Sequence, residues 1–244
     1  MTSFSLPTVT VRGLPFANTD ASGLQAWISH RLASKISTVI FTPNAKIGAD
    51  VMKNPRLHWL FEQADLLIPD GYGVLRASRR HATHPLSHRL PGIEAGEIIL
   101  RLAANFRIPV YFLGGKPGVA QAAAQTWKRR VPSLPIAGAH HGYFNATGEE
   151  HASLLHDIQT SGAGILLVGL GAPMQEQWII QNQSSLPSVR LFIGLGGSFD
   201  VWAGNLRRAP RIFRVSHLEW LWRMLCEPRR FKQIPHLLRY VFGP

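Results

Sequence analysis

Apolar positions in the first 200 residues fall into short continuous runs, separated by longer segments with helix-like spacing. Runs of this kind do not alternate with polar residues, which is typical of strands buried on both faces of a parallel sheet. We expect strands at residues 37–42, 65–69, 109–113, 164–168 and 189–193.

The intervening segments predict helices near residues 20–34, 45–63, 92–106, 117–130, 148–160 and 173–184. Asp20 suits the N-cap of the first helix, and Pro117 suits the first turn of the fourth. Regular alternation of strand and helix predicts an α/β fold with a parallel sheet and helices on both faces.

The residues that follow each strand form the candidate site, because ligands of such sheets bind outside the carboxyl ends of the strands. Nearly every strand is followed by glycine or a small polar residue, and glycine lets backbone amides approach a phosphate closely. These segments are Thr42-Pro43-Asn44, Asp70-Gly71-Tyr72-Gly73, Gly114-Gly115-Lys116-Pro117-Gly118, residues 169–176 and residues 194–200. Each alone has the composition of a tight turn; together they predict a nucleotide or sugar-nucleotide pocket.

Neither common nucleotide motif is complete. Lys116 is followed by proline, whereas a P-loop requires serine or threonine there. Gly169-Leu170-Gly171 lacks the third glycine of the dinucleotide fingerprint. The pocket is therefore not expected to be of either type.

Asp70 is the strongest candidate for acid–base chemistry. A carboxylate at the carboxyl end of a strand, followed by Gly-x-Gly, is placed to accept a proton from a bound hydroxyl. The alternative is a structural aspartate that caps the following helix. Thr42 and Asn44 supply a hydroxyl and an amide at the neighbouring strand end, where they also suit a simple turn.

Metal and covalent chemistry find little support in the sequence. His81, His84 and His88 lie among arginines without an adjacent carboxylate, and Pro85 interrupts a shared helix face. No Asp-x-Asp pair is present for a divalent ion on a diphosphate. Cys226 has no catalytic partner nearby, and Gly-x-Ser-x-Gly is absent. We expect no metal and no cofactor.

Composition fits one sizeable globular domain with an appendage: 244 residues, 45% hydrophobic and 16% charged. The formal net charge of +12 calls for an anionic partner. Residues 207–244 hold nine basic and two acidic residues, a net charge of +7. We therefore divide the chain into an α/β catalytic domain, residues 1–205, and a basic helical appendage, residues 206–244.

The chain begins without a secretory signal pattern and contains no apolar run of the roughly 18 residues that span a bilayer. A soluble or peripheral protein in the cytoplasm is expected. The single cysteine excludes an internal disulfide.

The appendage predicts two helical segments, residues 213–226 and 229–242, separated by Glu227-Pro228. Leucine and aromatic residues opposed by arginine and lysine are typical of an interfacial helix on anionic lipid. The alternative is a C-terminal helix packed on its own domain with a solvated basic face. Nucleic acid is not expected as the partner, because the aromatic residues follow a helix stripe and form no stacking platform.

Taken in order, the motifs resemble those of the WecG/TagA/CpsF glycosyltransferases (glycosyltransferase family 26) over residues 9–235. The matching elements are Thr42-x-Asn44, Pro69-Asp70-Gly71, Arg89-x-x-Gly92, Leu113-Gly114-Gly115-x-Pro117-Gly118, Gly142-Tyr143-Phe144, Val168-Gly169-Leu170-Gly171-x-Pro173-x-Gln175-Glu176, Gly196-Gly197-x-Phe199-Asp200, Arg208-Ala209-Pro210, Leu218-Glu219-Trp220-Leu221 and Glu227-Pro228-Arg229-Arg230.

The resemblance implies a Rossmann-like, mostly parallel α/β domain with a C-terminal appendage that touches the membrane and delivers arginines to the site. It implies metal-independent, inverting transfer of a hexose-type sugar from a UDP donor to a polyprenyl-diphosphate-linked saccharide. The donated sugar would be N-acetylmannosamine, its uronic acid or glucose. The reaction would occur at the inner face of the plasma membrane, in bacterial surface or exopolysaccharide assembly. A homo-oligomer is left open.

Carried over by position, Asp70 matches the general base of the family. Thr42 and Asn44 match the polar residues beside that base. Arg89 and Gln175 match residues placed at the donor or the acceptor. Charge on the departing diphosphate would be absorbed by arginines and backbone amides. The residues expected to bind the donor are Gly114, Gly115, Gly142, Tyr143, Gly169, Gly171, Gln175, Glu176, Gly197, Asp200, Arg208, Arg211, Arg223, Arg229 and Arg230.

Two positions depart from the family pattern: Glu94 replaces an aspartate, and His217 replaces a glycine. A rival hypothesis from another class is a sugar-nucleotide or nucleic-acid binding protein without catalysis. Asp70 discriminates between the two, because a binding protein needs no base at the strand end.

Overall fold

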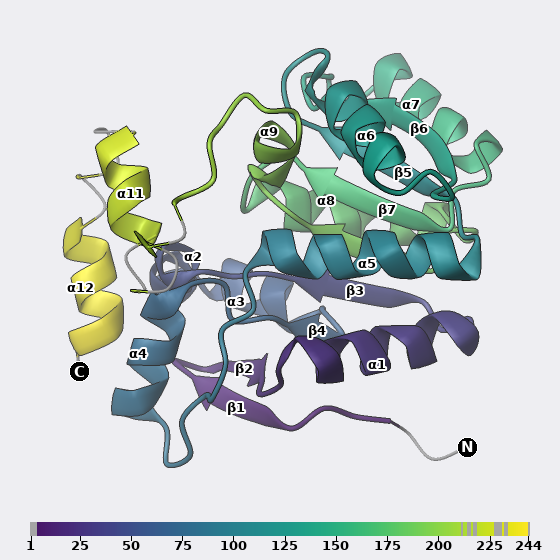
Figure 1. The fold of residues 1–244 in the computed structure, drawn as a ribbon. Helices are drawn as coiled ribbons and strands as arrows, with labels where there is room; N and C mark the ends of the chain where they lie inside the picture. The colour runs from purple at the N-terminus through teal and green to yellow at the C-terminus, as the bar shows by residue number, and fades with distance from the viewer. Residues whose placement is uncertain are drawn as a thin grey trace.

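Strands of the described chain form one eight-stranded sheet in the order β1-β2-β4-β3-β8-β7-β5-β6, seen in a computed structural model (Figure 1). Residues 4–210, 212–213, 216, 219–226, 231 and 234–243 are described. The strands are β1 (Thr8–Val11), β2 (Leu14–Ala17), β3 (Thr38–Phe41), β4 (Leu66–Leu67), β5 (Val110–Gly114), β6 (Ile136–His140), β7 (Ile165–Gly169) and β8 (Leu191–Gly194). Among these described strands, only β1 and β2 pair antiparallel, so the mostly parallel α/β fold is confirmed.

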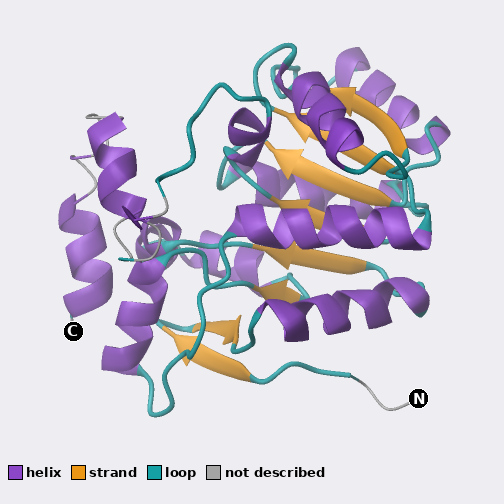
Figure 2. Cartoon of the chain, in the orientation of Figure 1, coloured by secondary structure: helices purple, strands orange, loops and turns teal. Residues whose placement is uncertain are grey.

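Helices cover both faces of this sheet (Figure 2). They are α1 (Ala21–Ala33), α2 (Ala45–Val51), α3 (Pro55–Glu62), α4 (Tyr72–His81), α5 (Gly92–Phe106), α6 (Val119–Arg130), α7 (Glu149–Thr160), α8 (Met174–Asn182), α9 (Ser198–Trp202), α11 (Glu219–Cys226) and α12 (Ile234–Phe242), with a 3-10 turn at Gln183–Ser185. All five predicted strands are present. Asp20 caps α1 by accepting a 2.8 Å hydrogen bond from the Gly23 amide, as expected.

Several sequence predictions need correction. The helix predicted over residues 45–63 is two helices, because Asn54 caps α3 and Pro55 occupies its first turn. Pro117 precedes its helix instead of lying in the first turn, since Gly118, with a φ of 86°, is the N-cap of α6. The strands β1, β2 and β6 and the helices α4 and α9 were not predicted.

Two cores lie on opposite faces of the sheet because neighbouring residues of each buried strand point to opposite sides. On β3, Ile40 belongs to the core that includes α1, α5, α6 and α9, whereas Val39 and Phe41 belong to the core that includes α2, α3, α4, α7 and α8. Both faces of the central strands are therefore apolar, as the continuous runs indicated.

The second core also includes α12, which packs on α2 and α4 (Figure 1). Tyr240 is buried, and the Arg12 guanidinium donates a 3.2 Å hydrogen bond to its carbonyl oxygen. This face of α12 agrees with the alternative that the last helix packs on its own domain. The described part of the preceding helix, α11, lies within the helix predicted over residues 213–226, and Glu227-Pro228 lies outside the described residues.

No helix within the described ranges is long and apolar enough to cross a membrane.

Candidate active site

The predicted catalytic residues gather where the chain leaves β3 and β8, two neighbouring parallel strands. From β3 the chain enters α2 on one face of the sheet, and from β8 it enters α9 on the other face. Where connections diverge in this way, open α/β sheets bind ligands in the crevice outside the carboxyl ends of the strands, which makes this the candidate site. The Thr42 hydroxyl joins the two strand ends by donating a 3.0 Å hydrogen bond to the carbonyl oxygen of Gly194.

Asp70 lies beside this hydrogen bond, between β4 and α4. Its amide donates a 3.3 Å hydrogen bond to the Pro43 carbonyl, and its Oδ1 accepts a 3.4 Å hydrogen bond from the amide of Gly92. The N-cap position of α4 is held by Gly71, the residue after Asp70, and not by Asp70 itself. Its carboxylate instead faces the first turn of α5, where the helix dipole favours negative charge.

Gly92 brings the start of α5 against Thr42. A Cβ atom on Gly92 would lie 2.9 Å from the Thr42 hydroxyl oxygen, so only glycine permits this approach. The structure therefore brings Thr42 and Asp70 together, as expected. Gly92 appeared in the sequence only as part of the Arg-x-x-Gly motif, which gave no sign of this contact.

Asn44 has a structural task at the same place. Its Oδ1 accepts hydrogen bonds from the amides of Lys46 (3.0 Å) and Ile47 (3.2 Å), which makes it the N-cap of α2. The side-chain oxygen of Asn44 therefore has the structural role that the alternative interpretation of a simple turn residue proposed.

The glycine loops lie backbone against backbone along the same edge of the sheet. The Gly115 amide donates a 3.0 Å hydrogen bond to the Gly169 carbonyl, and the Gly142 amide donates a 2.8 Å bond to the Gly115 carbonyl. A Cβ atom on Gly114 would lie 2.4 Å from the Gly169 carbonyl oxygen. The loops after β5, β6 and β7 thus form one surface of closely packed main chain at the carboxyl ends of the strands.

Gln175 and Glu176 lie beneath this surface rather than on it. Gln175 is 3% exposed; its Oε1 accepts a 2.9 Å hydrogen bond from the Gly196 amide, and its Nε2 donates a 2.8 Å bond to Glu176. Glu176 is fully buried, and its Oε2 has no hydrogen-bond partner. Desolvation by burial, partly offset by the bond from Gln175, raises the pKa of Glu176 to about 7. Both side chains support the loop after β8.

Four other expected donor-binding residues follow β6, β7 and β8, at the rim of the candidate site. Tyr143 is 66% exposed, in the loop after β6. Gly197 is the N-cap of α9, and a side chain there would meet nothing within 4 Å. Asp200, in the first turn of α9, accepts a 3.4 Å hydrogen bond from Asn205 through Oδ1. Gly171 has a φ of 80° in the loop after β7, a conformation that favours glycine.

Arginines reach this edge from two directions. Arg89 precedes α5 and forms a 3.2 Å ion pair with Glu219 of α11, and Arg208 forms an ion pair with Glu94. Glu219 was part of a recognised motif but was not predicted as a site residue, and nothing in the sequence indicated its partner. Arg211, Arg229, Arg230 and His217 lie outside the described residues, as does the side chain of Arg223.

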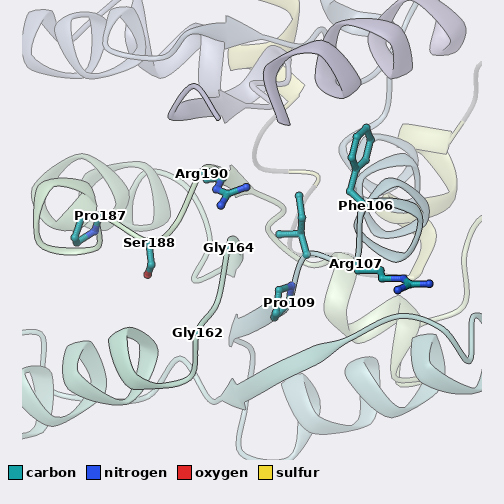
Figure 3. Close-up of a pocket in the computed structure, with 9 residues that line it drawn as sticks. Phe106, Arg107, Pro109, Gly162, Gly164, Pro187, Ser188 and Arg190 are labelled. Carbon is teal, nitrogen blue, oxygen red and sulfur yellow. The ribbon is translucent and has the colours of Figure 1, made fainter. Parts of the chain in front are cut away.

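A separate cavity of about 370 Å³ lies at the opposite edge of the sheet, at the amino ends of β5, β7 and β8 (Figure 3). Arg107 and Arg190 line it from different sides (Figure 3). None of the predicted site residues within the described part of the chain borders it. Among the residues that the structure describes, no group of three or more His, Cys, Asp or Glu side chains is arranged to hold a metal ion.

The arrangement brings a carboxylate, closely packed glycine loops and arginines to the carboxyl ends of parallel strands, and displacement of a phosphate leaving group uses residues of these types. Comparisons with known proteins agree. The chain is 33% identical to an N-acetylglucosaminyldiphosphoundecaprenol N-acetyl-beta-D-mannosaminyltransferase of Bacillus spizizenii over 224 residues, covering 90% of this chain and 85% of that one. It is 33% identical to a Staphylococcus aureus protein of the same name over 236 residues, covering 96% and 91%.

The sequence profile of the glycosyl transferase WecG/TagA/CpsF family matches residues 9–243. The resemblance found in the motifs is thereby confirmed over nearly the whole chain. This protein belongs to the WecG/TagA/CpsF family and is a glycosyltransferase.

Proposed function

We propose that this enzyme transfers N-acetylmannosamine from UDP-N-acetylmannosamine to a polyprenyl-diphosphate-linked N-acetylglucosamine, with inversion at the anomeric carbon. The acceptor and the sugar follow the names of the relatives. UDP-glucose and the uronic acid of N-acetylmannosamine are the alternative donors. The position of Asp70 carries the proposal, because its carboxylate lies in the crevice beside Thr42 and the first turn of α5.

In this mechanism Asp70 takes the proton from the acceptor hydroxyl as its oxygen attacks the anomeric carbon. The new glycosidic bond forms while the bond from the anomeric carbon to the diphosphate oxygen breaks, and UDP leaves with that electron pair. Thr42 fixes the two strand ends that flank the crevice.

The departing diphosphate gains negative charge, which main-chain amides and arginines stabilise. We assign this task to the glycine loops after β5, β6, β7 and β8 and to the arginines of residues 206–244. Tyr143 and Asp200, at the rim, are proposed to bind the nucleoside. With these groups on the diphosphate, the reaction is proposed to proceed without a metal ion or another cofactor.

Residues 206–244 are proposed to act as an appendage that binds the anionic inner face of the plasma membrane. Among the described residues of this segment, six large apolar side chains are exposed: Leu206 (45%), Ile212 (71%), Leu225 (56%), Phe231 (45%), Leu238 (52%) and Phe242 (44%). Exposed apolar side chains within a segment of net charge +7 suit the headgroup region of an anionic bilayer.

The proposal is tested by measuring UDP release from UDP-N-acetylmannosamine, UDP-N-acetylmannosaminuronic acid, UDP-glucose and UDP-N-acetylglucosamine, each with a short-chain polyprenyl-diphosphate N-acetylglucosamine. We expect acceptor-dependent release with the first donor. Binding of UDP-sugars without acceptor-dependent release from any of them would favour a binding protein without catalysis.

A further inference from the structure

Residues 89–94 link the candidate base to the rest of the protein. The Leu90 amide donates a 3.1 Å hydrogen bond to the carbonyl of Pro69, and the Gly92 amide donates a 3.4 Å bond to Asp70. Gly92 also packs against Thr42. A displacement of this segment would therefore move the groups that orient the Asp70 carboxylate.

The C-terminal part of the chain holds this same segment at both ends. Glu219 of α11 pairs with Arg89 at 3.2 Å, across 130 residues of sequence. Arg208 pairs with Glu94, across 114 residues. The two pairs have opposite polarity. Residues 206–244 supply the carboxylate to the pair at Arg89 and the guanidinium to the pair at Glu94.

The Arg89–Glu219 pair is shielded from solvent, with 17% and 16% of the two side chains exposed. A shielded pair holds its partners more firmly than an exposed one, because water and salt screen it less.

We propose that Glu219 is a positioning residue that acts through Arg89 to hold residues 89–94 against Asp70, and so couples the placement of α11 to the active site. The Arg208–Glu94 pair holds the other end of the segment, and we call these two ion pairs together the clamp. The inference deepens the proposed function and rests on it for the role of Asp70. The C-terminal part thus contributes a carboxylate that orders the site, in addition to any arginine that it brings to the diphosphate.

Hydrogen exchange of the full-length protein, without donor or acceptor, tests the clamp directly. The Leu90 and Gly92 amides report local opening of the segment. Glu219→Gln keeps the size of the side chain and removes its charge, and we expect it to speed exchange at these amides by about tenfold, the effect of losing a charged hydrogen bond. The matched control is Glu97→Gln, because Glu97 forms a 3.9 Å pair with Arg101 within α5 that does not involve the clamp.

A double-mutant cycle separates positioning from a general effect on the fold. In an Arg89→Ala background, Glu219→Gln should cause no further rise in exchange, because the partner through which it acts is gone. Equal rises in both backgrounds, or unchanged exchange in the single Glu219→Gln variant, would overturn the proposal. Thermal melts of every variant identify any global destabilisation, which would speed exchange across the whole sheet rather than at residues 89–94.

Steady-state kinetics supply the second readout. Glu219→Gln should lower kcat by about tenfold while the KM for the UDP-sugar changes by less than about twofold, because the base is misplaced and the donor surface is intact. A change confined to KM would contradict the assigned role. If exchange rises as expected but no donor in the panel is turned over, the clamp stands and the proposed function fails.

Discussion

The ring of Tyr240 lies directly over Gly48, so that a Cβ atom on Gly48 would be 2.4 Å from Cε2 of the ring. The contact joins the last helix of the chain to α2, which begins at the edge of the candidate site. Part of the predicted appendage is therefore packed on the α/β body, while Leu225, Phe231 and Leu238 remain exposed.

Gly48→Ala should loosen this packing, because the added methyl group cannot fit without moving the Tyr240 ring. Overpacking of a close contact costs about 1–3 kcal/mol. We expect a lower Tm and faster proteolysis within residues 206–244, measured by thermal melting and limited trypsin digestion. Gly197→Ala is the control, since a side chain at Gly197 meets nothing within 4 Å. Identical digestion of both variants would mean that Tyr240 does not hold the helix in place.

Burial of Glu176 makes the free energy of unfolding depend on pH, and it sets the direction of that dependence. Its pKa rises from 4.5 in the unfolded chain to about 7 in the folded protein, so the folded state binds the proton more tightly. Ionisation thus destabilises the folded protein progressively between pH 4.5 and about 7, by about 3 kcal/mol at the upper end.

Glu176→Gln removes this ionisation. The variant should gain stability relative to the unmodified protein as the pH rises from 5 to 8, with little difference near pH 4, as measured by urea unfolding across this range. A stability difference that stays constant with pH would show that Glu176 does not titrate as its burial indicates.

Membrane binding should depend on the exposed apolar side chains of the C-terminal part. A triple variant, Leu225→Ser, Phe231→Ser and Leu238→Ser, should lose at least about tenfold in partitioning to anionic phosphatidylglycerol vesicles, because each apolar side chain adds favourable burial. Sedimentation with vesicles measures the effect. Trp59→Ser is the control, since Trp59 is 57% exposed on α3 of the body. Unchanged sedimentation of the triple variant would show that these three side chains do not contribute to membrane binding.

Activity should survive EDTA, because arginines and main-chain amides are proposed to stabilise the departing diphosphate. Rates of UDP release with and without the chelator test this directly. Complete loss of activity that Mg²⁺ restores would overturn the metal-independent mechanism.

The main strands of the fold were predictable because their apolar runs are continuous, which only strands buried on both faces require. The other strands lack that signal. β6 (Ile136–His140) consists largely of alanine, glycine and histidine and is half-buried at the sheet edge. The hairpin of β1 and β2 contains Pro15 and lies at the opposite edge.

The site was predictable as a set of strand ends, because the carboxyl ends of parallel strands meet at one edge. The task of each side chain was not, because it depends on partners distant in sequence. Gln175 contacts Gly196 from below the loop, and Arg89 meets Glu219, which lies 130 residues away. Glu94, noted only as a departure from the family pattern, is the partner of Arg208. No local pattern encodes these pairs.

The central claim is that Asp70 is the base of a glycosyl transfer, and Asp70→Asn tests it most directly. Asparagine keeps the oxygen that accepts the Gly92 hydrogen bond but does not take a proton at neutral pH. Acceptor-dependent UDP release should fall by about 10²–10⁴-fold, the usual contribution of general base catalysis, while UDP binding measured by calorimetry changes little. Turnover close to that of the unmodified enzyme, with UDP binding intact, would contradict the account.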